Sequence, residues 1–191
     1  MELTKCLAMI DFDDINYLKY GNEKQRDAFQ VLSEHQVFKK LKPFDPFLAG
    51  TIPIAVDIET SDLDISCNYE DKQNFITELT VSFAHEKSFG LRETKIDEVE
   101  TVIANFMIGH FEVEVFGQPI PVKTQNAYRH LIIEYQILAM RGEVFRQEII
   151  KLKRQGLKTE PAFASLLGLN GNPYAALLAY SVSDLERQNA D

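Results

Sequence analysis

The stretch Gly50–Ile65 constrains the fold of this chain more than any other segment. It begins with a glycine–threonine pair, and after ten further residues come Asp62 and Asp64, separated by one leucine. If a strand runs from residue 63, side chains alternate between its faces, so both aspartates share one face while their apolar neighbours enter a core. Their Cα atoms would then lie roughly 6.6 Å apart. Two such carboxylates can converge on a cation, and oxygen ligands without a thiol or paired histidines favour Mg²⁺ or Mn²⁺ over zinc.

The composition is typical of a folded protein without a membrane span. The 191 residues are 45% hydrophobic and 26% charged, which is enough apolar material for one domain, or two small ones, with a buried core. No apolar run approaches the roughly 20 residues that a membrane span requires. The first residues lack an export signal, and the two cysteines, Cys6 and Cys67, provide no disulfide framework. We therefore expect a reduced, cytoplasmic protein.

The charge of the chain is unevenly distributed. The formal net charge is −9, yet residues 141–158 hold six basic residues against two acidic ones. An acidic protein lacks the broad basic surface that binds a phosphate backbone, which argues against long nucleic acid as a partner. The basic segment itself has two interpretations: it could receive an anionic substrate, or it could form the solvated face of a helix.

The order of predicted elements indicates an α+β fold. Asn22 and Gln25 have the spacing of a capping box at the start of a helix, which ends before Pro43. The later pattern predicts strands and helices in turn, namely a strand at 47–49, a strand at 62–67, a helix at 70–85, and strands at 86–91, 99–108 and 111–116. From residue 123 the chain is helical, with an interruption at Gly142. We therefore predict an α+β core over residues 1–121 and a helical C-terminal lobe over residues 122–191.

A third carboxylate is expected on the 111–116 strand. Two-metal phosphoryl or nucleotidyl transfer needs a further acid near the aspartate pair, and a neighbouring strand lies only about 4.8 Å away. Glu112 and Glu114 share one face of this strand. Glu114 is our choice because it is flanked by two valines just before the turn that follows Phe116, although Glu112 remains an alternative.

These motifs resemble the three-part signature of the polymerase-beta-like nucleotidyltransferase superfamily. In that superfamily a glycine–serine pair opens a helix, an acid-x-acid pair sits on the next strand, and a third acid sits on a neighbouring strand. The chain is also similar to a small bacterial domain family of unknown function, marked by Gly-Thr-x-Pro-Ile, Ser-Asp-Leu-Asp and Phe-Gly-Gln-Pro-x-Pro. That similarity extends from about residue 25 to 180. Here threonine replaces the usual serine, and the third acid is glutamate instead of aspartate.

The resemblance implies a mixed β-sheet flanked by helices and a specific set of site residues. Gly50 would let the backbone approach a nucleoside triphosphate, and Thr51 would donate to its phosphates. Asp62 and Asp64 would hold two Mg²⁺ or Mn²⁺ ions, and Glu114 would help to hold the catalytic one. Further nucleotide contacts are expected from two residues, which are Ser61 and Arg129.

The sequence thus predicts a Mg²⁺-dependent nucleotidyltransferase that moves a nucleoside monophosphate to a small-molecule or protein acceptor. Two other hypotheses come from different classes. One is a degenerate nucleotidyltransferase fold that acts as a binding or regulatory module, for example in a toxin–antitoxin pair. The other is a purely structural α+β domain. The complete trio of acids favours catalysis over the degenerate module, because a protein without activity would be free to lose it. A purely structural domain would show no metal dependence and no affinity for nucleotides.

Overall fold

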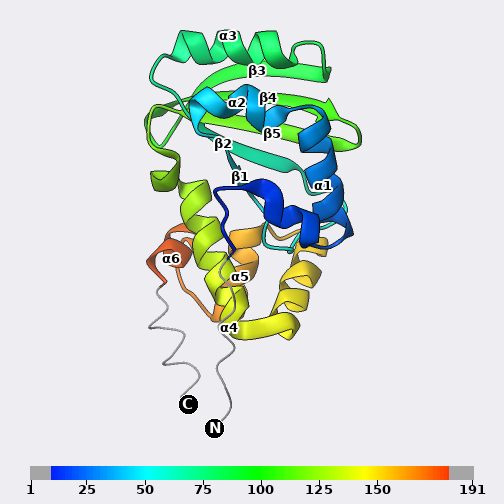
Figure 1. Ribbon diagram of the computed structural model, residues 1–191. Helices are drawn as coiled ribbons and strands as arrows, with labels where there is room; N and C mark the ends of the chain where they lie inside the picture. The colour runs from blue at the N-terminus through cyan, green and yellow to red at the C-terminus, as the bar shows by residue number, and fades with distance from the viewer. Residues whose placement is uncertain (1–9, 181–191) are drawn as a thin grey trace.

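A mixed five-stranded sheet forms the middle of the structure, a computed structural model that describes residues 10–180 (Figure 1). The strand order is β1-β2-β5-β4-β3. β2 and β5 run parallel, and the other neighbouring strands are antiparallel. The strands are β1 (Phe47–Ala49), β2 (Leu63–Asn68), β3 (Lys87–Ile96), β4 (Val99–Ile108) and β5 (Phe111–Gln118). The predicted mixed sheet flanked by helices is confirmed.

Short helices precede and interrupt the sheet. They are the 3-10 helix η1 (Ile15–Tyr20), α1 (Glu23–Glu34), α2 (Val37–Leu41), the 3-10 helix η2 (Lys42–Phe44) and α3 (Lys72–Phe83). The predicted capping box at the start of α1 is confirmed, because Asn22 and Gln25 each bond the other's backbone N–H. The single helix expected up to Pro43 is wrong, because Gln36 adopts a left-handed conformation with φ of 54° and separates α1 from α2.

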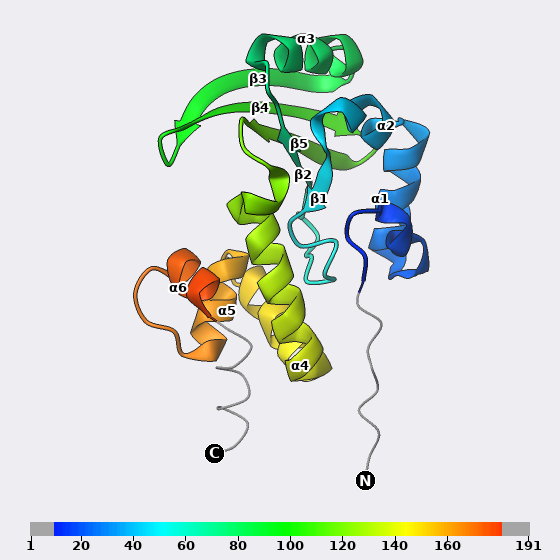
Figure 2. The same cartoon turned by 60° about the vertical axis from the view of Figure 1, so that its left-hand side comes forward.

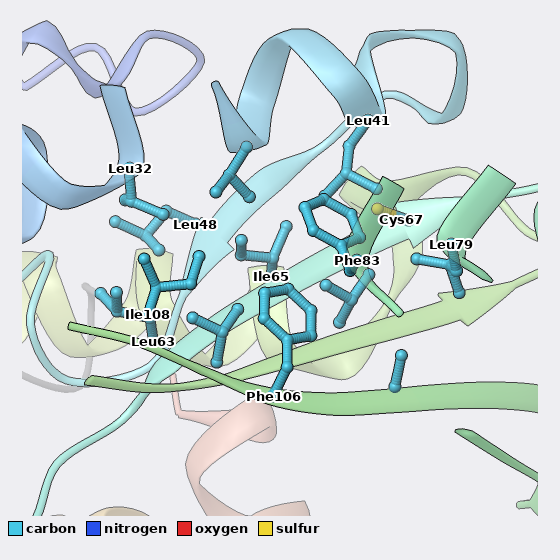
Figure 3. Close-up of a cluster of buried hydrophobic side chains, with 14 of the residues drawn as sticks. Leu32, Leu41, Leu48, Leu63, Ile65, Cys67, Leu79, Phe83, Phe106 and Ile108 are labelled. Atoms are coloured by element: carbon cyan, nitrogen blue, oxygen red, sulfur yellow. The ribbon is translucent and has the colours of Figure 1, made fainter. Parts of the chain in front are cut away.

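One face of the sheet forms the main hydrophobic core. Alternate residues of β2, among them Leu63, Ile65 and Cys67, are fully buried and pack with side chains of α1, α2 and α3 (Figure 3). Phe83 of α3 stacks on Phe106 of β4, with their ring centroids 4.6 Å apart. Because strand side chains alternate, the intervening residues of β2 and β5 project from the opposite face. That second face carries the predicted carboxylates.

The C-terminal part of the described chain is helical, as predicted (Figure 2). It contains the 3-10 helix η3 (Val122–Thr124), α4 (Asn126–Arg154), α5 (Thr159–Leu167) and α6 (Pro173–Ala179). The predicted interruption at Gly142 is confirmed, since its φ of 75° and ψ of −167° kink α4. A second hydrophobic cluster joins these helices to Phe47 and Val56 from the N-terminal half. The division into two units at residue 122 stays a prediction.

Two expectations concern the environment of the chain. Within residues 10–180, no helix combines the length and the apolar character needed to cross a membrane. Cys67 is a free, buried thiol in β2, while Cys6 lies outside the described residues.

Candidate functional site

Two predicted acids lie side by side on the second face of the sheet. β2 and β5 are parallel neighbours, and their register places Asp64 directly opposite Glu114. Asp62 lies just before β2, which begins at Leu63 instead of residue 62 as predicted. All three acids line a cleft of about 740 Å³. Glu112 is exposed and is not among the residues that line this cleft, so the structure brings Glu114 to the aspartates and leaves Glu112 outside.

The acids at this cleft repel one another. Burial, followed by the nearby carboxylates of Asp62 and Glu114, raises the pKa of Asp64 to about 7. In the described part of the chain, the side-chain carboxylates of Asp62 and Asp64 take part in no hydrogen bond or ion pair. Oxygen donors that form no ion pair fit the preference of Mg²⁺ or Mn²⁺ for hard ligands. A dication here would offset a repulsion that Lys153 of the same cleft offsets only in part.

Glu114 is oriented by polar groups that the sequence analysis did not identify. Asn105 of β4, its cross-strand neighbour, donates from Nδ2 to Glu114 Oε2 at 3.2 Å. Arg92 of β3 donates to Asn105 Oδ1 at 2.8 Å and lies 3.6 Å from Glu114 Oε2. Both neighbours engage the same carboxylate oxygen. The other oxygen, Oε1, takes part in neither of these contacts.

The loop between β1 and β2, residues 50–62, brings Gly50, Thr51 and Ser61 to the same cleft. Thr51 donates its hydroxyl to Ser61 Oγ at 3.1 Å, and Ser61 Oγ also accepts from the N–H of Ile58 at 3.0 Å. The Ser61 hydroxyl hydrogen stays available to a ligand. Residues 50–55 form turns, so this glycine–threonine pair does not open a helix as the glycine–serine pair of the superfamily does.

Gly50 has a structural reason to be glycine. Its φ is +75°, and a Cβ built on its backbone would lie 2.2 Å from Oδ2 of Asp64. Any side chain at this position would displace the Asp64 carboxylate or the loop. Gly50 therefore sets how closely the 50–62 loop approaches the acids.

The basic segment of the sequence, 141–158, has two different surroundings. Arg146 donates to the backbone carbonyls of Ile54 and Ala55 in the 50–62 loop. Lys153 is buried, donates to the carbonyl of Val56 at 2.9 Å, and lines the cleft, where burial lowers its pKa to about 8. Lys151 instead pairs with exposed Glu148. Lys151 thus fits the solvated helix face, while reception of an anionic substrate by the basic residues that line the cleft stays a prediction.

Arg129 is not brought to the cleft. It is exposed and contacts Asn126, its neighbour on α4, through an Nη1–Oδ1 distance of 3.4 Å. Gln125, which shares its helix face, is buried and donates to the carbonyls of Cys67 and Ile120. Gln125 thus ties the start of α4 to β2.

The helical side of the cleft holds residues that the sequence analysis did not predict as metal ligands. His130 and Glu134 of α4 and Glu160 of α5 line it, and each offers a ligand atom within 4.8 Å of the other two. Over residues 10–180, Asp62, Asp64 and Glu114 do not form a group that tight. The four-residue spacing of His130 and Glu134 in the sequence indicates that they share a helix face. Their proximity to Glu160 depends instead on how α5 packs against α4.

Comparison with known proteins relates this architecture to a family and to a fold. A family model described as a domain of unknown function, DUF4269, matches residues 30–180. No curated protein matches the sequence.

Two solved structures of the Cid1 poly(U) polymerase are similar to this chain. For the form bound to MgGTP the TM-score is 0.54 at 8% identity, covering 85% of this chain and 53% of that one. For the complex with the UTP analog UMPNPP the TM-score is 0.50 at 11% identity, covering 81% and 54%. The chain thus spans about half the length of these structures. Together with the sheet order, this similarity shows a nucleotidyltransferase-like fold.

Proposed function

Because the chain belongs to the DUF4269 family and adopts a nucleotidyltransferase-like fold, we propose that it is a Mg²⁺-dependent nucleotidyltransferase. It transfers a nucleoside monophosphate from a nucleoside triphosphate to a small-molecule or protein acceptor. One observation carries the proposal: Asp64 and Glu114 lie opposite each other on parallel strands, in a cleft that Gly50 and Thr51 also line.

Each residue has a role that its surroundings support. Asp62, Asp64 and Glu114 hold the metal ions, which neutralise the charge that develops on the phosphates. Asn105 and Arg92 keep one Glu114 oxygen turned toward β4. An acceptor hydroxyl loses its proton to solvent, and its oxygen forms a bond to the α-phosphorus as the bond from that phosphorus to the bridging β-phosphate oxygen breaks. Pyrophosphate leaves with the electron pair of the broken bond.

The loop residues bind the triphosphate in this proposal. The Ser61 hydroxyl hydrogen is available to a phosphate oxygen, because Ser61 Oγ acts only as an acceptor within the loop. Thr51 can redirect its hydroxyl from Ser61 to the ligand. Lys153 supplies a positive charge on the opposite wall of the cleft. Arg129 has no part in this arrangement, since it lies away from the cleft.

A thermal-shift panel tests the proposal. ATP, GTP, CTP and UTP are each added with and without Mg²⁺ to the wild type and to Asp64→Asn, Glu114→Gln and Glu112→Gln. We expect one nucleotide at 100 times its Kd to stabilise the wild type by about 2.7 kcal/mol, a rise in Tm of about 5 °C or more, only when Mg²⁺ is present. Asp64→Asn and Glu114→Gln should abolish this rise.

Glu112→Gln is the matched control, because Glu112 is two residues from Glu114 on β5 but is exposed and outside the cleft. It should keep the wild-type response. A nucleotide that stabilises all variants equally without Mg²⁺ would instead favour the binding or regulatory module. Flat curves for all four nucleotides would contradict the proposed donor class. The donor found by the panel can then be labelled at its α-phosphate to find the acceptor.

A further inference from the structure

A second set of metal-type ligands lies on the helical side of the cleft. His130 and Glu134 are four residues apart in α4, so they share one helix face. Glu160 is in the first turn of α5, which packs against α4. Each of the three residues offers one ligand atom, and these atoms all lie within 4.8 Å of one another.

Two of these side chains are buried and carry polar atoms that have no partner among the described residues. His130 is 6% exposed and Glu134 is 4% exposed. His130 Nδ1 and Glu134 Oε1 are shielded from solvent, and nothing within residues 10–180 forms a hydrogen bond to them. A buried polar atom left unsatisfied destabilises a fold, so a pair of them beside a carboxylate is a place where a bound cation would satisfy both.

The described residues do not supply a counter-charge at contact distance. Lys153 acts on Glu134 electrostatically, but within residues 10–180 no ion pair joins them, and Lys153 Nζ donates to the carbonyl of Val56. Two carboxyl groups thus lie beside one imidazole without an ion-pair partner among these residues.

We propose that His130, Glu134 and Glu160 bind a first-row transition-metal dication of the Zn²⁺ class. One imidazole nitrogen and two carboxylate oxygens suit zinc or its neighbours better than Mg²⁺, which prefers oxygen ligands and retains several waters. Three protein ligands leave a coordination position open. Since all three residues line the cleft, that position is accessible to water or to an oxygen of a bound molecule. The proposal does not depend on nucleotidyl transfer.

The test is direct zinc binding to the tag-free full-length chain. All variants are made in a background protein that already carries Asp64→Asn, because this substitution weakens zinc binding at the sheet carboxylates. After equilibration with ZnCl₂ and removal of free metal, we expect elemental analysis to find one zinc per chain. Glu134→Gln and His130→Gln, each in that background, should weaken zinc binding by at least about tenfold in calorimetry.

Glu148→Gln is the matched control, because Glu148 is on the same helix but exposed and paired with Lys151. It should leave one zinc bound. Glu134→Gln replaces a buried carboxyl group by an amide of nearly the same shape, so the metal-free fold should be kept, which circular dichroism checks. If it is not kept, partly exposed Glu160→Gln provides the same test. Absence of zinc from the background protein, or zinc retained by both ligand variants, would overturn the proposal.

Discussion

Gly50 joins the 50–62 loop to the acids through a contact that leaves no room for a side chain. Two separate constraints act on it: its φ of +75° and the Asp64 Oδ2 atom 2.2 Å from any Cβ. The first constraint costs about 1–2 kcal/mol for a residue with a Cβ, wherever it occurs. The second is particular to this site, because relief of the clash requires the Asp64 carboxylate to move. The two contributions can therefore be separated experimentally.

We predict that Gly50→Ala lowers the free energy of unfolding by more than Gly168→Ala does. Gly168 has a similar φ of +66°, but nothing lies within 4 Å of the position that an alanine methyl group would occupy there, so it shares only the backbone cost. The excess for Gly50→Ala should be about 1 kcal/mol or more in urea unfolding of the metal-free protein. Combining Gly50→Ala with Asp64→Ala should remove this excess. Equal costs for the two glycines would contradict the close contact.

The fold elements and part of the site could be predicted because they depend on local patterns. Strict alternation identified β5, and the acid-x-acid pair identified the cleft face of β2. The choice between Glu112 and Glu114 could not be settled locally, since both lie on one face. It depended on the register between β2 and β5, which places Asp64 opposite Glu114.

The rest of the site depends on contacts between elements. Asn105 and Arg92 meet Glu114 through the pairing of three strands, and no spacing in the sequence records that pairing. His130 and Glu160 meet because α5 folds back on α4. The periodicity of a helix shows which side is apolar, but a buried polar residue such as His130 interrupts that pattern without indicating its partner.

One buried amide links the start of α4 to the sheet by hydrogen bonds, beside the apolar contacts of the second cluster. Gln125 is 2% exposed, and its Nε2 donates to the carbonyl of Cys67 at 2.9 Å and to that of Ile120 at 3.2 Å. The first bond links the start of α4 to β2, the strand that carries Asp64. Loss of this amide would leave buried carbonyl oxygens with one donor fewer.

We predict that Gln125→Ala lowers the free energy of unfolding by about 2 kcal/mol, or the Tm by roughly 4–8 °C. Gln147→Ala is the control: Gln147 lies on the same helix, is exposed and bonds only Glu143 among the described residues. Its cost should stay within about 0.5 kcal/mol. Thermal unfolding of both variants measures the difference. A Gln125→Ala protein as stable as the control would show that α4 is held by apolar packing alone.

At the scale of the whole molecule, the cleft concentrates acids between two separately packed clusters. One wall contributes Asp64 and Glu114 from the sheet, and the other contributes Glu134 and Glu160 from the helices. Lys153 partly offsets them, and it lowers the pKa of Asp64 while the acids raise it. The metal-free protein therefore carries an electrostatic cost that grows as these groups ionise. That cost has a defined pH dependence.

Asp64→Asn should stabilise the metal-free protein at pH 8 and do so much less at pH 5. The ordinary pKa of 3.8 applies to Asp64 in the unfolded chain, and the folded value is about 7. Because the pKa of Asp64 is higher in the folded protein, Asp64 of the unfolded chain loses its proton at a lower pH as the pH rises. Ionisation of Asp64 therefore favours unfolding progressively between pH 4 and 7. This cost is absent below pH 4 and reaches about 4 kcal/mol above pH 7. Asparagine does not ionise and avoids it.

The measurement is urea unfolding in EDTA at pH 5 and pH 8 for the wild type, Asp64→Asn and Glu112→Gln. The stability gained by Asp64→Asn should fall by more than half between pH 8 and pH 5, because the wild-type cost at pH 5 is then below about 2 kcal/mol. Exposed Glu112→Gln should give no pH-dependent gain. Saturating Mg²⁺ should stabilise the wild type more than Asp64→Asn, since only a carboxylate offers the cation a charged ligand. An Asp64→Asn protein that is less stable than the wild type at pH 8 without metal would contradict the charge repulsion on which the proposed site depends.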